Sequence, residues 1–242
     1  MSLSSRCSSH RANHLLSTLL SDDFAFLEPH LQLVDLHRGT VIYDVGDRMP
    51  FIYFPHEAIV SLVTVLADGK TIEMAKLGGE AMFGLASALI TRRSLGRYVV
   101  QSTGRASRVD TEVLYRGFVA RPTLRDHVLR FAEDLLAQTL HSMACNALHS
   151  VEARCCRWIL TMQDRTSQDV LPLTHEHLSR MMGVQRSTIS AAMHALQAAG
   201  AIRQGRGVVT VIDRRGLEQT VCGCYEIIRQ QSKQAQCPEV RI

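Results

Sequence analysis

The chain has 242 residues, of which 46% are apolar, and a formal net charge of +4 at pH 7. This length is enough for one or two hydrophobic cores. No apolar run approaches the roughly 18 residues that a membrane-spanning helix needs, and the N-terminus lacks a signal-peptide pattern. Seven cysteines in a chain of this length do not resemble a secreted disulfide framework. We therefore expect a soluble cytoplasmic protein that makes no membrane contact.

Positive charge is concentrated in the C-terminal part of the chain. Residues 1–150 contain 15 basic and 15 acidic residues, whereas residues 151–242 contain 12 and 8. Between residues 172 and 216, two acidic residues accompany six arginines, which are Arg180, Arg186, Arg203, Arg206, Arg214 and Arg215. Local positive charge of this kind is typical of a surface that meets a polyanion.

The first half of the chain predicts a β-rich domain. Residues 1–14 are predicted to be a disordered N-terminus, and short helices are expected from there to about residue 32. Beyond them, β-branched and aromatic segments alternate with Gly and Pro turns. Strands are predicted at 40–43, 51–54, 59–65, 71–77, 98–102 and 106–110. Short antiparallel strands with glycine turns predict a sandwich or barrel-like roll, which we place within residues 15–120.

Residues 121–149 predict one long helix, with Pro122 suited to its first turn. One apolar stripe has the 4,3 spacing of a coiled coil and comprises Leu124, Val128, Phe131, Leu135, Gln138, Ser142 and Cys145. A second stripe beside it comprises Leu129, Ala132, Leu136, Leu140 and Met143. Two stripes can pack against two surfaces, the chain's own β domain and the same helix of a second subunit. We expect a homodimer and assign the first stripe to dimerisation; the alternative is a helix buried within one monomer.

Residues 174–200 form the most informative stretch. Thr174 is a plausible N-cap, Gly183 permits a tight turn, and a second helix is predicted over about 185–199. Apolar residues recur along one side of that second helix, so that side is expected to be buried. Two short helices joined by a glycine turn predict a helix-turn-helix, whose second helix can enter the major groove of DNA.

Strand-like segments follow at 201–204 and 208–212, joined across Gly205-Arg206-Gly207, and predict a β-hairpin wing with a basic tip. The alternative is a helical hairpin packed within a core, and such a hairpin does not require a cluster of arginines without acidic partners. The predicted domain runs over residues 150–242 and ends in a helix expected over 217–230. The residues predicted to contact DNA are Gln185, Arg186, Ser187, Thr188, Ser190, Ala191, His194, Arg203 and Arg206.

The order of β-roll, long helix and winged helix-turn-helix resembles the Crp–Fnr superfamily of bacterial transcription regulators over roughly residues 15–215. Its most specific parts are the Gly-x-x-x-x-Gly segment at 79–84 and the run from Gly183 to Ile189. The resemblance implies an α+β fold with a cyclic-nucleotide-binding-like jelly roll, a dimerisation helix and a winged helix-turn-helix. It also implies a homodimer that binds near-palindromic double-stranded DNA and works with RNA polymerase.

The same resemblance assigns roles within the second helix. It implies a base contact for Arg186 and phosphate contacts for Gln185 and Thr188. Ser187 and Ala191 replace a Glu and an Arg with which many members read bases, so the family's preferred DNA sequence is not carried over.

The resemblance also points to a candidate effector pocket. In the cyclic-AMP-binding branch, a Glu follows the second glycine and an Arg-Ser pair holds the phosphate. Here Leu85 stands in the place of that Glu, and Arg93-Ser94 falls about two residues early, so cyclic AMP is not expected. Another nucleotide, or no ligand, stays open, and the nearby arginines can instead form a solvated loop. The candidate effector residues are Gly84, Leu85, Ala86, Ser87, Arg93, Ser94 and Arg97.

Metal and catalytic sites are not predicted. Only Cys7 lies near the N-terminus, so the iron–sulfur cluster of the oxygen-sensing branch is not expected. His141, Cys145 and His149 share an i, i+4, i+8 spacing, which suits a polar patch between helices or, as the alternative, a metal or thiol switch. Cys222 and Cys224 would point to nearly opposite faces of a helix.

Neither a Gly-x-Ser-x-Gly motif nor a Walker A loop occurs, and we expect no enzyme. The alternative function is a ligand-binding β-roll module that regulates a protein partner, with DNA binding secondary.

Overall fold

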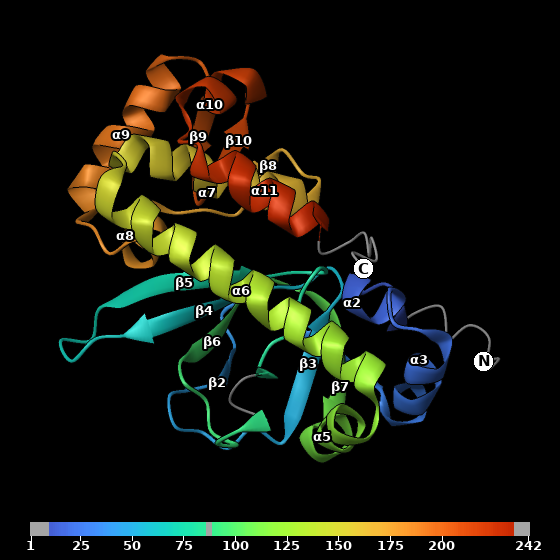
Figure 1. Cartoon of the computed structure of the whole chain (residues 1–242). Coiled ribbons are helices and arrows are strands. Elements are labelled where there is room, and N and C mark those ends of the chain that lie inside the picture. Colours follow the sequence, from blue (N-terminus) through green and yellow to red (C-terminus); the bar gives the residue numbers. More distant parts are fainter. Residues whose placement is uncertain (1–9, 86–88, 235–242) are drawn as a thin grey trace. The chain divides into compact units, whose positions relative to one another are not determined.

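The computed structural model describes residues 10–85 and 89–234 and divides into two compact units (Figure 1). Among the described residues, the first unit comprises residues 10–63, 75–85, 89–137 and 231–234, and the second comprises residues 64–74 and 138–230. Among the described residues, none of the helices combines the length and apolar character needed to span a membrane.

Strands dominate the first part of the chain and form two antiparallel sheets, one in the order β1-β7-β3 and one in the order β2-β6-β4-β5. The strands are β1 Gln32–Leu36, β2 Val41–Tyr43, β3 Phe51–Pro55, β4 Ile59–Val65, β5 Thr71–Leu77, β6 Arg97–Ser102 and β7 Gly104–Asp110. Central strand β7 pairs with β1 from Gln32 to Leu36 and with β3 from Phe51 to Pro55. The predicted β-rich roll is therefore confirmed, and β1 is a strand that the sequence pattern did not single out.

Helices flank these strands (Figure 1). They are α2 His14–Ser17, α3 Ser21–Leu27 with a 3₁₀ turn η1 at Glu28–His30, α5 Thr111–Ala120 and α6 Pro122–Leu148. Helix α5 was not expected from the sequence; Asp110 caps it by accepting a hydrogen bond from the backbone N–H of Glu112 at 2.7 Å. Gly117 allows α5 to approach its neighbours, because a Cβ there would lie 2.7 Å from Leu124 and 2.8 Å from Phe26.

The expectation of a disordered N-terminus is wrong for residues 10–14, while residues 1–9 lie outside the described residues. Asn13 is fully buried, and its amide donates to the carbonyls of Pro55 at 2.7 Å and Ala81 at 2.9 Å. Its side-chain oxygen accepts from the backbone N–H of Leu16 and so caps α2. A buried amide that bonds carbonyls from two other segments of the chain holds this segment in place.

The assignment of the two stripes of α6 needs correction. Leu124, Val128 and Phe131 lie in the chain's own core, with exposed fractions of 1%, 2% and 6%. Leu135 packs against the same core, Gln138 and Ser142 are half-buried, and Cys145 is buried beside two other cysteines. Four apolar residues of the second stripe are exposed, with exposed fractions of 51% for Leu129, 60% for Leu136, 56% for Leu140 and 53% for Met143. The apolar residues of the first stripe therefore pack within their own chain, which is not what its assignment to dimerisation predicts.

The second unit contains a small three-stranded sheet in the order β8-β10-β9 and a set of short helices. Its elements are α7 Val151–Thr166, β8 Val170–Leu171, α8 His175–Met182, α9 Arg186–Ala198, β9 Ile202–Gly205, β10 Val208–Val211 and α10 Arg214–Thr220. Helix α11, Cys224–Gln234, follows. The single helix predicted over 217–230 is instead two helices, because Val221 adopts an extended conformation between α10 and α11.

The first unit contains a pair of buried histidines, His10 and His56. The hydroxyl of Ser107 lies 2.7 Å from His10 Nδ1 and 2.8 Å from His56 Nε2. His56 Nδ1 is buried without a hydrogen-bond partner among the described residues. Burial lowers the pKa of His56 to about 4 and also lowers the pKa of His10. Protonation would therefore place an unsatisfied charge inside the folded unit.

We expect acid to destabilise the first unit through His56. Between about pH 6.5 and about pH 4 the unfolded chain binds a proton at His56 that the folded chain does not, so stability falls as the pH falls through this window. The loss should be on the order of 2–3 kcal/mol. Chemical unfolding followed by far-UV circular dichroism at several pH values measures it. His56→Gln should flatten the profile, whereas His30→Gln, at an exposed position, should leave it unchanged; identical profiles for all three proteins would contradict this assignment.

Candidate functional site

Helices α8 and α9 form a helix-turn-helix whose turn is set by local sequence. The Thr174 hydroxyl caps α8 by accepting from the backbone N–H of His177 at 3.1 Å. Gly183 is the C-cap of α8 and has a φ of +65°. Residues other than glycine adopt this left-handed backbone conformation at a cost in free energy. Buried Arg154, on α7, donates to the carbonyl of Met182 at 2.6 Å and satisfies the last turn of α8.

Helix α9 has one buried face and one exposed face. Ile189, Ala192, Met193 and Leu196 are buried, as the periodicity predicts. The exposed residues at its start and along its outer side are Gln185, Arg186, Ser187, Thr188, Ala191 and His194. No side chain caps the first turn at Gln185, so the positive end of the helix dipole faces solvent beside Arg186. A helix end of this kind is suited to an anion such as phosphate.

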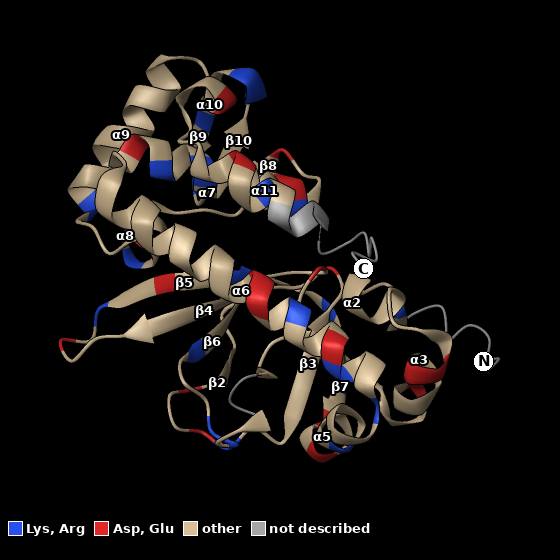
Figure 2. Ribbon diagram, in the orientation of Figure 1, with Lys and Arg blue, Asp and Glu red and all other residues tan. Residues whose placement is uncertain are grey.

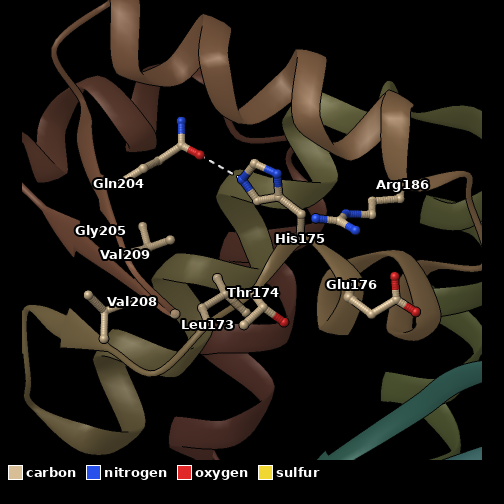
Figure 3. Close-up of a pocket in the computed structure, with 10 residues that line it drawn as sticks. Leu173, Thr174, His175, Glu176, Arg186, Gln204, Gly205, Val208 and Val209 are labelled. Carbon is tan, nitrogen blue, oxygen red and sulfur yellow. Dashed lines mark hydrogen bonds between the residues drawn. The ribbon is translucent and has the colours of Figure 1, made fainter.

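One imidazole joins α8, α9 and the strands that follow (Figure 3). His175 Nδ1 lies 2.9 Å from the Ser190 hydroxyl on α9, and Nε2 lies 2.6 Å from Gln204 Oε1 on β9. The Gln204 amide in turn donates to the carbonyl of Met193 at 3.1 Å. The backbone N–H of Gln204 donates to the side chain of Gln197 at 2.8 Å. These bonds fix α9 and β9 relative to the start of α8.

A hollow of about 450 Å³ opens between these elements. It is lined by the start of α8, Arg186 at the start of α9, and the strands β9 and β10. Figure 3 shows His175 between Gln204 on one side and Arg186 on the other, with Glu176 close to Arg186. The hollow therefore lies beside the exposed end of α9, on the same side of the unit as the hairpin.

Strands β9 and β10 form the predicted hairpin wing. Gly205 pairs with Val208, so Arg206 and Gly207 make the turn, and Gly207 has a φ of +76°. Arg206 at the tip and Arg203 on β9 are both exposed. Strand β8 pairs with β10 on its other side and completes a sheet that the sequence did not predict.

Arginines are coloured blue in Figure 2, and two of the six in this region form ion pairs with acidic residues. Arg214 binds Asp164 and Glu218, each at 2.8 Å, and Arg180 binds Glu176 at 3.1 Å. The others are exposed and form no ion pair with another described residue; they are Arg186, Arg203, Arg206 and Arg215. Positive charge therefore stays uncompensated on α9, on the wing and at the start of α10.

The structure separates Ser190 from the other residues predicted to contact DNA. Its hydroxyl lies within hydrogen-bond distance of both His175 Nδ1, at 2.9 Å, and the carbonyl of Arg186, at 3.0 Å, so it serves the internal network. His175, Gln197 and Gln204 were missed by sequence reasoning, and their contacts span up to 29 residues of sequence. Neither hydrophobic periodicity nor a short motif can predict a contact between residues that lie this far apart in the sequence.

The candidate effector residues are engaged within the first unit. The Arg97 guanidinium binds Asp44 at 2.7 Å, and Arg93 donates to the carbonyl of Gly46 at 2.9 Å. Ser94 is buried and its hydroxyl donates to the carbonyl of Gly96. Because Arg93 and Arg97 already bond groups of the same unit, these contacts agree better with the alternative of a loop than with arginines left free to bind a phosphate.

The segment around Gly84 is tied to an aromatic cluster. Gly84 has a φ of +97° and a Cβ there would lie 2.7 Å from Met49, so glycine is required. Tyr98 hydrogen-bonds the backbone of Gly84, and Phe83 stacks on Tyr53 with ring centroids 4.8 Å apart. Leu85 is buried; Ala86 and Ser87 lie outside the described residues.

Known proteins resemble this chain in sequence and in fold. The model of the Crp-like helix-turn-helix domain matches residues 153–220. A global nitrogen regulator of Synechococcus elongatus is 24% identical over 199 residues, which are 78% of this chain and 89% of that protein. A CRP-like cAMP-activated global transcriptional regulator of Mycobacterium tuberculosis is 24% identical over 193 residues, or 76% and 86% of the two chains.

The fold agrees with these matches. The structure of a transcriptional regulator of the CRP family from Thermus thermophilus covers 77% of this chain and 95% of its own, with a TM-score of 0.67 at 20% identity. The matched proteins are transcription regulators, and the matched domain contains α8, α9 and the wing. Together these matches support a DNA-binding transcription regulator of the Crp/Fnr superfamily, with a Crp-like helix-turn-helix domain over residues 153–220.

Proposed function

We propose that this regulator acts as a homodimer that binds near-palindromic operators in double-stranded DNA, with α9 in the major groove and the wing on the backbone. The observation that carries the proposal is the exposed, uncapped start of α9 beside Arg186, held against the basic wing by the bonds of His175. In a two-fold dimer the two copies of α9 would meet half-sites about one helical turn apart. This action would take place in the cytoplasm, where bacterial DNA lies.

The proposed interface contains contacts to base edges, which read the sequence, and contacts to phosphates, which position the protein. Arg186, in the first turn of α9, is suited to a bidentate bond with guanine O6 and N7. Gln185, Thr188, Arg203 and Arg206 would hold phosphates and set the register, with little information about sequence. Ser187, Ala191 and His194 complete the exposed face of α9 and are available to base edges. Ser190 is better suited to positioning, because its hydroxyl is used internally.

The dimer would form along the exposed stripe of α6. Leu129, Leu136, Leu140 and Met143 are each more than half exposed and recur with steps of seven, four and three residues. That spacing is typical of a coiled-coil seam. Exposed apolar rows of this length on a soluble helix indicate an interface.

Regulation by a small molecule and contact with RNA polymerase rest on the family resemblance. The loss of the glutamate at Leu85, together with the engagement of Arg93 and Arg97, supports an effector other than cyclic AMP, or no effector. The alternative of a module that regulates a protein partner is not favoured, because the matched relatives are transcription regulators.

Selection from a random duplex DNA library, followed by titration of variants, tests DNA recognition. A near-palindromic site should be enriched without added ligand. Arg186→Ala should relax specificity at one base pair per half-site by about 1–3 kcal/mol. Arg206→Ala should weaken binding to all sequences and reduce the salt slope by about 1 for each wing on DNA. A uniform loss of affinity in both variants would show that the recognition helix is placed wrongly.

A charge within the exposed stripe of α6 should dissociate the dimer. Leu136→Asp would bury a carboxylate in an apolar seam, and sedimentation velocity at micromolar concentration should then find monomers. Leu95→Asp makes the same chemical change at an exposed position away from α6 and should leave the dimer intact. If Leu136→Asp stays dimeric, another surface forms the dimer.

The hydrogen bonds of His175 should matter for affinity, although His175 itself need not touch DNA. His175→Phe keeps the ring volume and removes both bonds, which should weaken operator binding by roughly 5- to 30-fold through a loosened wing. Gln204→Leu should have a similar effect, and the double variant should lose little more because both changes break one network. Operator affinity is measured by fluorescence-anisotropy titration. If the free-energy losses of the two single variants add fully in the double variant, His175 and Gln204 do not act through one network.

A further inference from the structure

Four metal-ligating side chains converge in the second unit, apart from the DNA-binding surface. Cys145 and His149 lie one turn apart near the C-terminal end of α6, and Cys222 and Cys224 lie around the junction of α10 and α11. Cys145 Sγ is 3.5 Å from Cys222 Sγ, and Cys224 Sγ is 3.6 Å from His149 Nδ1. All four potential ligand atoms lie within 4.8 Å of one another.

The turn between α10 and α11 makes this convergence possible. On a continuous helix, Cys222 and Cys224 would point to nearly opposite sides. Here α10 ends at Thr220, Val221 is extended, and α11 begins at Cys224, so the two cysteines flank Gly223 in a turn. The backbone N–H of Tyr225 donates to the carbonyl of Cys222 at 3.0 Å and closes that turn. The expectation of no metal site assumed a helix at this point.

The donor set suits one class of ion. Three cysteines and one histidine are a recognised structural zinc set, with Zn–S distances of about 2.3 Å and Zn–N distances of about 2.0–2.1 Å. A tetrahedron of that size has edges of roughly 3.8 Å between its sulfurs. The observed separations of 3.5 and 3.6 Å are close to these edges, so small side-chain rotations would complete the geometry. Sulfur donors disfavour Mg²⁺ and Ca²⁺, which prefer oxygen.

The surroundings also suit a bound ion. Cys145, Cys222 and Cys224 are buried, whereas His149 is partly exposed and leaves a path for entry. Three thiolates around Zn²⁺ carry a net charge of −1, which favours a nearby cation.

Two arginines of α7 meet that need. Arg154 interacts electrostatically with Cys145 and Cys222, and Arg157 does so with Cys224. The Nε–H groups of both arginines are buried and have no hydrogen-bond partner among the described residues. Donors of this kind are suited to the thiolate sulfurs of a negatively charged site.

We propose that Cys145, His149, Cys222 and Cys224 bind one Zn²⁺ ion per chain. Binding releases the three thiol protons to solvent and involves no change of oxidation state. Cys145 and Cys222 are 77 residues apart, and α7, α8, α9 and the wing all lie between them. The ion would therefore close a loop around the whole DNA-binding segment and tie its end back to α6.

Metal binding to the full-length protein tests the site. The protein is stripped with a chelator, kept reduced with a phosphine, and titrated with Zn²⁺ against a chromogenic chelator. A background of Cys7→Ser and Cys237→Ser removes the two cysteines that lie outside the described residues. We expect one Zn²⁺ per chain, and Co²⁺ in its place should show the visible bands of a tetrahedral thiolate complex.

Variants separate ligands from neighbouring thiols. Cys222→Ser, Cys224→Ser and His149→Ala should each weaken Zn²⁺ binding by at least about 100-fold, since even changes to supporting residues cost about 10- to 100-fold. Cys155→Ser and Cys156→Ser alter buried cysteines of α7 and should retain full affinity. Circular dichroism establishes that each variant is folded, and the partly exposed His149 provides a test that does not depend on a buried position.

Three outcomes would overturn the proposal. The first is a folded, reduced protein that binds no Zn²⁺. The second is wild-type affinity in both Cys222→Ser and His149→Ala. The third is a Cys145–Cys222 disulfide found by peptide mapping, with no Zn²⁺ uptake after reduction, which would assign a thiol pair in place of a metal site.

Discussion

The position of the recognition helix depends on the two nitrogens of His175. One ring nitrogen bonds Ser190 on α9 and the other bonds Gln204 on the wing, and Gln204 also holds the carbonyl of Met193. Short helices and a two-stranded hairpin have little stability by themselves. A side chain that bonds both elements therefore supports the geometry on which base recognition depends.

Arginine serves two physical purposes in the same unit. Arg154 is buried and completes the C-terminal turn of α8, and Arg214 joins α10 to α7 through Asp164 while also pairing with Glu218 on its own helix. Arg186 and Arg206 are exposed and have no ion-pair partner among the described residues. The first kind stabilises the scaffold, whereas the second leaves positive charge for DNA phosphates and bases. A count of positive charge alone cannot distinguish these uses.

Helix α6 and the cysteine cluster show how one element can serve several partners. Leu124, Val128 and Phe131 of its first stripe lie in the core of the first unit, whereas Leu129, Leu136, Leu140 and Met143 are exposed and form the proposed seam with a second subunit. Its last turns carry Cys145 and His149 toward the turn after α10. If that cluster holds zinc, the same helix would bear the dimer seam and one end of the cross-link around the DNA-binding segment. The proposed seam and the proposed metal site use different residues of α6 and different chemistry.

The sequence by itself determined the helix-turn-helix, the wing, the long helix and most strands, because caps, glycine turns and periodicity act over a few residues. Thr174, Gly183 and the buried side of α9 follow that logic. Only the tertiary structure decided which stripe of α6 is buried, that Asn13 anchors the N-terminal segment, and that Ser190 turns inward. It alone also brought Cys222 to Cys145. These outcomes depend on contacts between residues far apart in the chain, and local pattern does not encode which distant surfaces will meet.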